Sequence, residues 1–494
     1  MRRALQRAVL RTRGLPGFDA LYKAIYAGAV AGSARALHAL PGMESVYLHR
    51  GLSREGWEPG LSDVDLILVR GETAPGSDEA EFLARLAARA ASLRRLFPMF
   101  GDLWLGSPSE LRSYLRWGGL RAWEDVPHWK LLRGRAAEFP ALAESEPKRR
   151  RLDPWVWLFL SHMEISRRSF GGGGEFPERA DAQIRKLSLD ARRYSDFILA
   201  EGEPLLSRAQ AKARAPEIAA MNARELWLDS ALRLAHASRF VLSEVATGET
   251  ASTEFPPSSS ESLRRLVSSV SAARGAVADP PYHAYLLLDE GAAAADYERA
   301  AEGLAAEPQP GVALVLEPAA WALLLQSSYL GAPLGWLGSE GGSPSPRGET
   351  VFPGWGASAC GELPRSLPLL PERLRRETAA EAASWMLLWW RCLWIAPDSA
   401  NRFVLYHLYT RALGLRLMLS GETGQPLCDW ELLLARSASR FENESRPAAR
   451  LRSLLLGESA ATLDSPSRAA LASGHLAAAA GLMGGLGRAL EDFR

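Results

Sequence analysis

The feature that most constrains the fold is an Asp-x-Asp pair at the start of an apolar run. Asp63 and Asp65 precede the uninterrupted apolar stretch of residues 66–69. Alternate side chains of a β-strand point to the same face, so two carboxylates at this spacing lie side by side. Like charges this close are unfavourable unless a cation lies between them. An apolar run without polar alternation is typical of a strand that is buried on both faces.

A third carboxylate lies in the next apolar run. Asp102 falls within residues 97–105, and a helix with one apolar face is predicted between the two runs, over residues 78–96. A strand, crossover helix and strand would bring Asp102 beside Asp63 and Asp65 if the two strands are neighbours. Carboxylates converging from adjacent strands suit Mg²⁺, which prefers oxygen ligands. Two such ions can activate a hydroxyl and neutralise a triphosphate.

A glycine-containing loop connects the first apolar run to the acidic pair. The run of residues 46–50 ends at Gly51, which lies 12 residues before Asp63. A Gly at a strand end, a Gly-containing loop and the sequence Ser-Asp-x-Asp-Leu at 62–66 resemble the signature of the nucleotidyltransferase superfamily. That superfamily includes polymerase-beta-like enzymes and antibiotic nucleotidyltransferases. The resemblance covers roughly residues 20–135.

The resemblance implies roles for particular residues. Asp63 and Asp65 would be the metal-binding pair and Asp102 the third carboxylate of the catalytic and metal-binding set. Two Mg²⁺ ions and a nucleoside triphosphate, with ATP the expected donor, would be the cofactors. The implied reaction transfers a nucleoside monophosphate to a hydroxyl of a small molecule or a protein and releases pyrophosphate.

The nucleotide-binding residues depart from the family pattern. The family usually has Gly-Ser or Gly-Gly at the first element, whereas here Leu52 follows Gly51 and the hydroxyl comes one residue later, at Ser53. We expect Gly51 and Ser53 to approach the phosphates, with a shifted or weakened contact. Lys186, on a helix expected over 178–201, is a candidate triphosphate ligand by analogy. The alternative for Lys186 is a solvated helix face.

Other functions stay open at this point. A catalytically inactive nucleotide-binding or regulatory module of the same fold is the main alternative, because of Leu52. An interaction scaffold and a nucleic-acid-binding protein are two more. The formal net charge of +1 gives no general electrostatic attraction to nucleic acid, so a small-molecule or protein acceptor is favoured.

Composition bears on the cellular compartment. The three cysteines, Cys360, Cys392 and Cys428, have no close spacing, which argues against a disulfide framework or a zinc knuckle and predicts a cytoplasmic protein. No stretch of 18 uncharged apolar residues is present, so we expect no membrane span. Residues 1–11 are basic and amphipathic, which fits a targeting segment, a surface anchor or a solvated first helix.

The length of 494 residues predicts two to four domains in an α+β protein. We expect a nucleotidyltransferase-like mixed sheet with helices, then helical regions and a second, degenerate α/β half. The expected ranges are 1–148 for the catalytic domain, 149–252 for a helical domain, 276–340 for the degenerate nucleotidyltransferase-like half and 357–494 for a C-terminal helical domain.

The second half is predicted from a repeated order of elements. An apolar run at 282–288, a helix at 296–306, an apolar run at 311–316 and a helix opening at Pro318 follow the order found over residues 61–116. Aligned on sequence, His283, Tyr285 and Val312 occupy the three carboxylate positions. Further expectations are helices at 15–40, 107–116, 153–168, 178–201 and 222–247, a strand at 128–134, a linker at 343–356 and mostly helix from 373 onward. Ser107 and Glu110 have the spacing of a capping box, and the charged residues 146–151 predict a solvated linker or a phosphate-facing patch. His162 lies in an apolar helical stripe, which predicts a satisfied, buried or half-buried histidine.

Overall fold

The computed structural model describes residues 2–54, 57–71, 77–138, 147–170, 177–200, 204–253, 257–258, 260–279, 283–306, 312–326, 335–339, 349–353, 358–364, 366–391, 412–420 and 465–493. These residues group into two compact units. Unit 1 comprises those within 1–144, 379–421 and 433–494, and unit 2 those within 145–378. Helices and mixed sheets occur together in the chain, which confirms the α+β class.

The four expected domains are grouped differently in the structure. The range 357–494 is divided between the units, and most of its described residues belong to unit 1. The ranges 149–252 and 276–340 both belong to unit 2, because the helices of the first pack on the sheet of the second. Cys392 and Cys428 lie outside the described residues.

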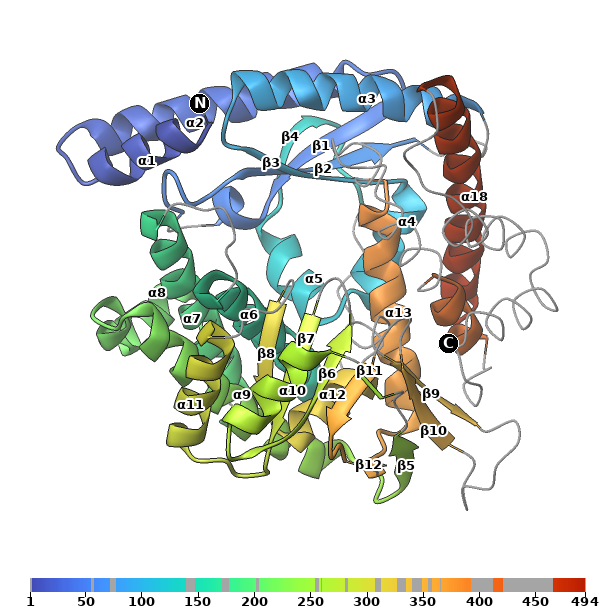
Figure 1. Ribbon diagram of the computed structural model, residues 1–494. Helices are drawn as coiled ribbons and strands as arrows, with labels where there is room; N and C mark the ends of the chain where they lie inside the picture. The colour runs from blue at the N-terminus through green and yellow to red at the C-terminus, as the bar shows by residue number, and fades with distance from the viewer. Residues whose placement is uncertain are drawn as a thin grey trace. The chain divides into compact units, whose positions relative to one another are not determined.

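Unit 1 is built on a four-stranded mixed sheet (Figure 1). Its spatial order is β3-β2-β1-β4, where β2 runs antiparallel to β1 and parallel to β3, and β4 runs antiparallel to β1. Each strand falls on a run that the sequence predicted. The bounds are β1 (Met43–His49), β2 (Val64–Arg70), β3 (Phe100–Gly106) and β4 (Lys130–Gly134).

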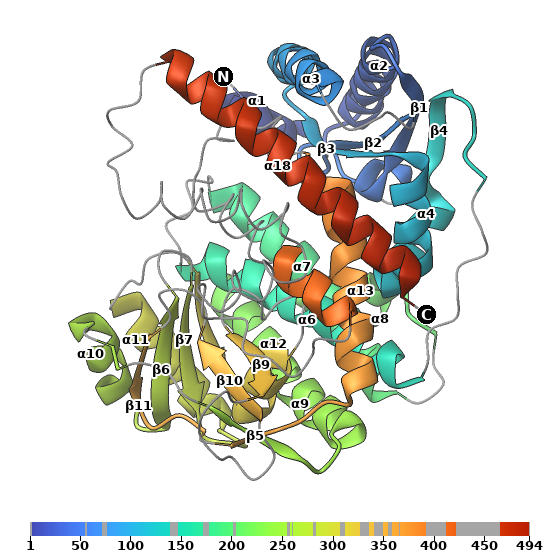
Figure 2. The same ribbon diagram turned by 90° about the vertical axis from the view of Figure 1, so that its right-hand side faces the viewer.

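Both faces of this sheet are covered. Figure 2 shows α2 (Phe18–His38) and α3 (Ser77–Leu96) on one side and α4 (Pro108–Trp117) on the other. Trp385, on α13 (Glu372–Trp389), also packs on the second face, with its ring 4.9 Å from that of Trp104. The apolar run of β2 is accordingly buried on both sides, as its lack of alternation predicted.

Helix starts in unit 1 follow capping chemistry. The Ser107 hydroxyl accepts the Glu110 N–H at 3.2 Å, and the Glu110 carboxylate accepts the Ser107 N–H at 2.8 Å. This reciprocal pair is the capping box that the sequence predicted. At the C-terminal end of the chain, α18 (Ser465–Asp492) packs against α3 and α4.

One helix start in unit 2 differs from the expectation. We expected a charged linker followed by a helix beginning at Asp153 and Pro154, but α6 (Pro147–Phe170) begins earlier and contains Pro154. Contacts of Arg151 attach the first turns of this helix to the rest of unit 2. The Arg151 guanidinium lies 2.6 Å from the Glu244 carboxylate and over the Phe240 ring, which ties this turn to α9 (Ala223–Val245).

Unit 2 contains a second mixed sheet with the order β11-β6-β7-β8. Strand β7 runs antiparallel to β6 and parallel to β8, and β11 runs antiparallel to β6. The strands are β6 (Ala273–Asp279), β7 (His283–Leu288), β8 (Val312–Leu316) and β11 (Ser358–Gly361), and the helices around them are α10 (Glu261–Ser269), α11 (Ala294–Ala306) and α12 (Pro318–Gln326).

The two sheets have the same topology. In each, a central antiparallel pair is followed by a crossover helix, a parallel strand and a helix that begins with proline. The β1–β2 pairing is irregular directly after the pair Met43–Arg70, and the β6–β7 pairing is irregular directly after the pair Ala273–Leu288. This correspondence supports the hypothesis that residues 276–340 are a degenerate copy of the first sheet.

The strand pairing corrects the residue alignment between the two sheets. Asp65 pairs with His49, the last residue of β1, and His283 pairs with Asp279, the last residue of β6. His283 therefore corresponds to Asp65, where the sequence alignment had set Tyr285. Val312 corresponds to Asp102, as aligned, because the following residues pair in the same way.

A third sheet includes residues that were expected to be linker. It has the order β12-β5-β10-β9, with β5 (Thr250–Thr253), β9 (Gly335–Ser339), β10 (Glu349–Pro353) and β12 (Ser366–Pro368). Glu349–Pro353 lies inside the expected 343–356 linker. Its flanks are rich in Gly, Pro and Ser, but Thr350, Val351 and Phe352 favour a strand once partner strands are available.

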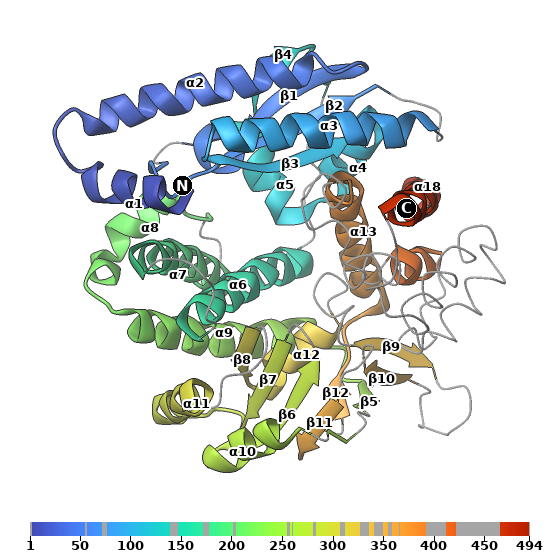
Figure 3. The ribbon, with the colours of Figure 1, turned by 45° about the horizontal axis from the view of Figure 1, so that its top comes forward.

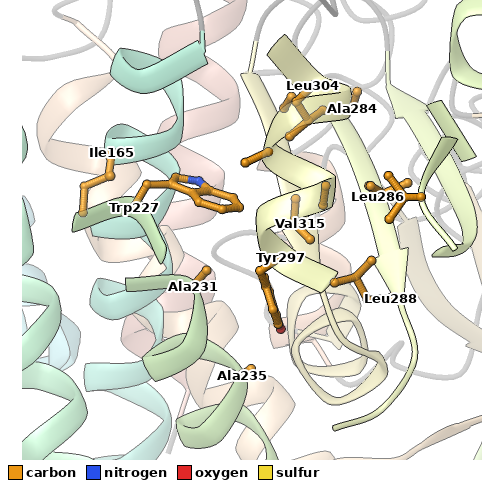
Figure 4. Packing of buried hydrophobic residues seen from close by; sticks show 14 of the residues in the cluster. Ile165, Trp227, Ala231, Ala235, Ala284, Leu286, Leu288, Tyr297, Leu304 and Val315 are labelled. Atoms are coloured by element: carbon orange, nitrogen blue, oxygen red, sulfur yellow. The ribbon is translucent and has the colours of Figure 1, made fainter. Parts of the chain in front are cut away.

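The core of unit 2 joins the second sheet to α6 and α9 (Figure 4). Trp227 lies fully buried at its centre and donates its indole N–H to the Ser166 hydroxyl at 2.9 Å. His162 is also fully buried, with Nδ1 2.8 Å from the Ser230 hydroxyl. A satisfied core histidine is what the sequence predicted. Burial lowers the pKa of His162 to about 3.

We expect His162 to make the stability of unit 2 sensitive to acid. Its pKa is about 3 in the folded state, whereas the ordinary pKa of an exposed histidine is 6.5. Between these values the unfolded chain binds a proton that the folded chain does not, so the free energy of unfolding falls as the pH falls. The slope is about 1.4 kcal/mol per pH unit.

Chemical denaturation between pH 6 and pH 4 measures this slope. The His162→Gln variant is expected to lose it, whereas His236→Gln, an exposed histidine on α9, is expected to keep it. Equal slopes in wild type and His162→Gln would contradict the assignment.

Candidate functional site

The candidate site lies where the pairing of β2 and β3 is irregular. Val64 pairs with Phe100 and Leu66 pairs with Leu103, so the single residue Asp65 lies opposite two residues, Gly101 and Asp102. Such bulges re-aim side chains and are common beside active sites. Here the Asp65 carboxylate accepts the backbone N–H of Asp102 at 2.9 Å.

Gly101 allows the acidic residues to approach one another. A Cβ atom at position 101 would lie 2.3 Å from Asp65 Oδ1 and 2.8 Å from Asp63 Cβ. Both distances are shorter than any tolerated contact, so only glycine leaves room for Asp63 and Asp65 beside β3. The fold thus brings Asp63, Asp65 and Asp102 to one edge of the sheet.

The three carboxylates have different environments. Asp65 is half-buried, and burial raises its pKa, although the nearby Arg50 guanidinium acts in the opposite direction. Asp63 is half-buried as well, whereas Asp102 is exposed. The site therefore holds a carboxylate whose charge is costly, Asp65, next to one that is largely exposed to water, Asp102.

Arg50 provides the positive charge at this site, and the sequence analysis did not identify it. Its Nη1 lies 3.3 Å from Asp102 Oδ2, and its guanidinium lies 4.5 Å from the centre of the Trp104 ring. Among the described residues Arg50 is the only non-glycine residue with positive φ, at 57°. A left-handed arginine costs free energy, and such residues cluster at functional sites. Its position directly before Gly51 was the available signal.

A buried histidine–aspartate pair lies behind the carboxylates. His49 is the strand partner of Asp65, and its Nδ1 lies 3.3 Å from Asp125 Oδ2. Both side chains are fully buried. The His49 Nε2 atom is buried without a hydrogen-bond partner among the described residues. Burial lowers the pKa of His49, so its imidazole is held neutral.

Asp125 keeps its charge despite being buried. Burial alone would raise its pKa, but the His49 hydrogen bond and the charges of Arg121 and Arg54 hold the pKa well below its ordinary value. Arg54 Nη2 lies 3.0 Å from Oδ1, and the Trp129 indole N–H donates to Oδ2 at 3.2 Å. No motif marks Asp125 in the sequence, because His49 and Arg54, which bury and pair it, are distant along the chain.

The turn that was expected to approach phosphates is closed on itself. Arg50–Ser53 forms a single 3₁₀ turn directly after β1. Leu52 and Ser53 are buried, and the Ser53 hydroxyl donates to the Arg50 carbonyl at 2.8 Å. Phosphate oxygens need donors, and this hydroxyl has its one proton engaged. A Cβ atom at position 51 would lie 3.6 Å from the Ser62 side chain, an ordinary contact distance, so the packing does not require glycine there.

Lys186 lies in unit 2, on α7 (Pro177–Leu199), whereas the carboxylates lie in unit 1. Its neighbour Asp190 is already paired with arginines. Asp190, which forms ion pairs with Arg193 and Arg208, has a pKa held low mainly by Arg208, with a smaller contribution from Lys186.

The donor atoms at the site suit a hard divalent cation in kind, since all three are carboxylates. In this structure, however, Asp65 and Asp102 are paired with other protein groups. Within the described ranges, no group of three or more His, Cys, Asp or Glu side chains is gathered closely enough to hold a metal ion. Arg50 pairs with Asp102, and a backbone N–H pairs with Asp65. A metal at this site would have to replace the Arg50 contact.

No protein-family profile, curated protein or solved structure matches this chain. No helix in the described part of the chain could span a bilayer, given its length and hydropathy.

A methyl group at position 101 is expected to disrupt the site. Gly101→Ala would overpack the contact with Asp63 and Asp65 and lower the free energy of unfolding by about 1–3 kcal/mol. Gly28→Ala is the matched control, because a Cβ there meets nothing within 4 Å and alanine favours the α2 helix. Urea denaturation measures both, and equal stability of the two variants would contradict the close approach.

Proposed function

We propose that unit 1 is a Mg²⁺-dependent nucleotidyltransferase. It would transfer a nucleoside monophosphate from a nucleoside triphosphate, with ATP as the expected donor, to a hydroxyl of a small molecule or a protein. The observation that carries the proposal is the convergence of Asp63, Asp65 and Asp102 at a bulge in a mixed sheet. The turn at Gly51 lies next to these residues, but its Ser53 hydroxyl donates to the Arg50 carbonyl, so the proposal does not rest on a phosphate contact from this turn.

Each residue of the site would have its own role in the reaction. Asp63 and Asp65 would hold the metal ions, and Asp102, exposed at the sheet edge, would complete the set and accept the proton of the acceptor hydroxyl. Bound Mg²⁺ supplies charge neutralisation of the triphosphate and lowers the pKa of the attacking hydroxyl. Arg50 would exchange its contact with Asp102 for the phosphates, since a guanidinium binds both groups.

An assay that follows the labelled nucleoside monophosphate from the nucleotide to an acceptor tests this function. We expect wild type, incubated with α-labelled nucleotides, Mg²⁺ and a metabolite or lysate pool, to transfer label. Asp63→Asn combined with Asp65→Asn should reduce transfer by about 100-fold or more, because the amides cannot hold the metal ions as carboxylates do. Asp196→Asn, a half-buried aspartate of unit 2 paired with Arg233, should retain transfer. Wild type without transfer to any pool would contradict the proposal.

A specific observation favours a second candidate, an inactive nucleotide-binding module. Arg50 already compensates Asp102, and the described carboxylates are not gathered as a ligand set. In that case Mg-ATP would bind without turnover, and calorimetry would give the same affinity for wild type and Asp63→Asn. A loss of binding in Asp63→Asn would favour the enzyme.

Arg50 and a divalent cation are expected to compete for Asp102. Arg50→Met should raise the affinity for Mg²⁺ about fivefold, the size of a partly exposed ion pair, and the gain should shrink at high salt. Arg35→Met, an exposed arginine on α2, is the control and should leave the affinity unchanged. Titration with Mg²⁺ in calorimetry measures the effect, and an unchanged affinity in Arg50→Met would show that the two cations do not share a site.

A further inference from the structure

The α1–α2 hairpin carries an unusual concentration of exposed hydrophobic side chains. In the part of the chain that the structure describes, seven large hydrophobic residues are exposed, and four of them lie between positions 15 and 25. They are Leu15 at 50%, Phe18 at 38%, Leu21 at 52% and Ile25 at 45%. Single exposed hydrophobic residues are ordinary, but a cluster of them marks an interaction surface.

The spacing makes these residues one stripe. Phe18, Leu21 and Ile25 are separated by three and four positions on α2, so they share a face of the helix. Leu15 lies in the turn between α1 (Arg2–Thr12) and α2. Figures 1 and 3 show the two helices side by side, joined at the end of unit 1 that extends past the edge of its sheet.

The hairpin is held together as a structural element. The Thr12 and Tyr22 hydroxyls are hydrogen-bonded at 2.6 Å, which joins the end of α1 to the start of α2. The Tyr26 hydroxyl accepts the Gly60 N–H at 3.0 Å and anchors α2 to the loop before β2. The stripe is therefore presented on a fixed support.

The excess of positive charge near the stripe indicates which kind of partner binds there. Residues 2–25 contain five arginines and Lys23, against the single acidic residue Asp19. Asp19 is itself paired with Lys23 at 2.7 Å, and Arg7 and Arg11 are exposed on α1. Basic residues next to an exposed apolar face suit an anionic lipid surface, where the side chains insert and the cations meet headgroup phosphates.

We propose that the α1–α2 hairpin binds anionic membrane surfaces. The tip at Leu15 and the stripe formed by Phe18, Leu21 and Ile25 lie among the acyl chains at the interface, and Arg7 and Arg11 lie at headgroup level. This binding is peripheral, because neither helix could cross a bilayer. It is independent of the nucleotidyl-transfer proposal.

Co-sedimentation with vesicles tests the proposal on the full chain. Wild type is expected to bind vesicles of equal parts phosphatidylglycerol and phosphatidylcholine, more weakly at high salt, and not to bind phosphatidylcholine alone. Leu15→Ser with Leu21→Ser and Ile25→Ser should reduce partitioning by more than about 10-fold. Arg7→Gln and Arg11→Gln should each reduce it roughly fivefold.

A matched triple variant controls for loss of surface hydrophobicity. Leu96→Ser, Trp123→Ser and Leu131→Ser remove the three other exposed hydrophobic residues and should leave partitioning unchanged. Circular dichroism during thermal unfolding should show that both triple variants are folded, because all six positions are exposed.

Two results would overturn the proposal. One is that wild type does not bind the anionic vesicles at low salt. The other is that wild type binds no vesicles and forms a dimer in light scattering, whereas the variant with serine at Leu15, Leu21 and Ile25 is monomeric. In that case a second copy of this chain would be the occupant of the stripe.

Discussion

The hydrogen bond from the Asp102 N–H to the Asp65 carboxylate is the contact on which the candidate site depends. It bridges β2 and β3 where their regular pairing is interrupted, so it replaces a ladder hydrogen bond with one from a side chain. It requires that no side chain stand at position 101. A buried strand, a bulge and a glycine thus act together to hold an acidic side chain at the sheet edge, where its charge is costly.

Positive charge around this contact is arranged in two layers. Arg50 lies on the exposed side, between Asp102 and the Trp104 ring, and its left-handed backbone shows that the fold maintains this position against a local cost. Behind it, Asp125 is fully buried and is neutralised by Arg54 and Arg121 while it binds His49. The buried groups around Asp125 are expected to keep their positions, because loss of any partner would leave a buried charge uncompensated and destabilise the fold.

The second sheet uses the same topology without the acidic residues. His283 and Val312 stand where Asp65 and Asp102 stand in unit 1, and a bulge like that at Asp65 is absent from the β7–β8 pairing within its described residues. The strands pair in uninterrupted register from His283 to Leu287. In unit 1 the irregular pairing falls at Asp65, so the residue that the bulge re-aims is an acidic one.

The sequence by itself determined the local elements of unit 1. The apolar run of β2, the amphipathic α3 and the capping box at Ser107 all follow from patterns within a few residues, where period and chemistry decide the outcome. The approach of Asp102 to Asp63 and Asp65 also needed the pairing of β2 with β3, which the sequence could only suggest. The tertiary structure alone decided the contacts of Arg50, the buried His49–Asp125 pair and the strand at Glu349–Pro353. Each of these depends on partners far along the chain, and local propensity carries no information about which distant groups will desolvate a side chain or pair with a backbone.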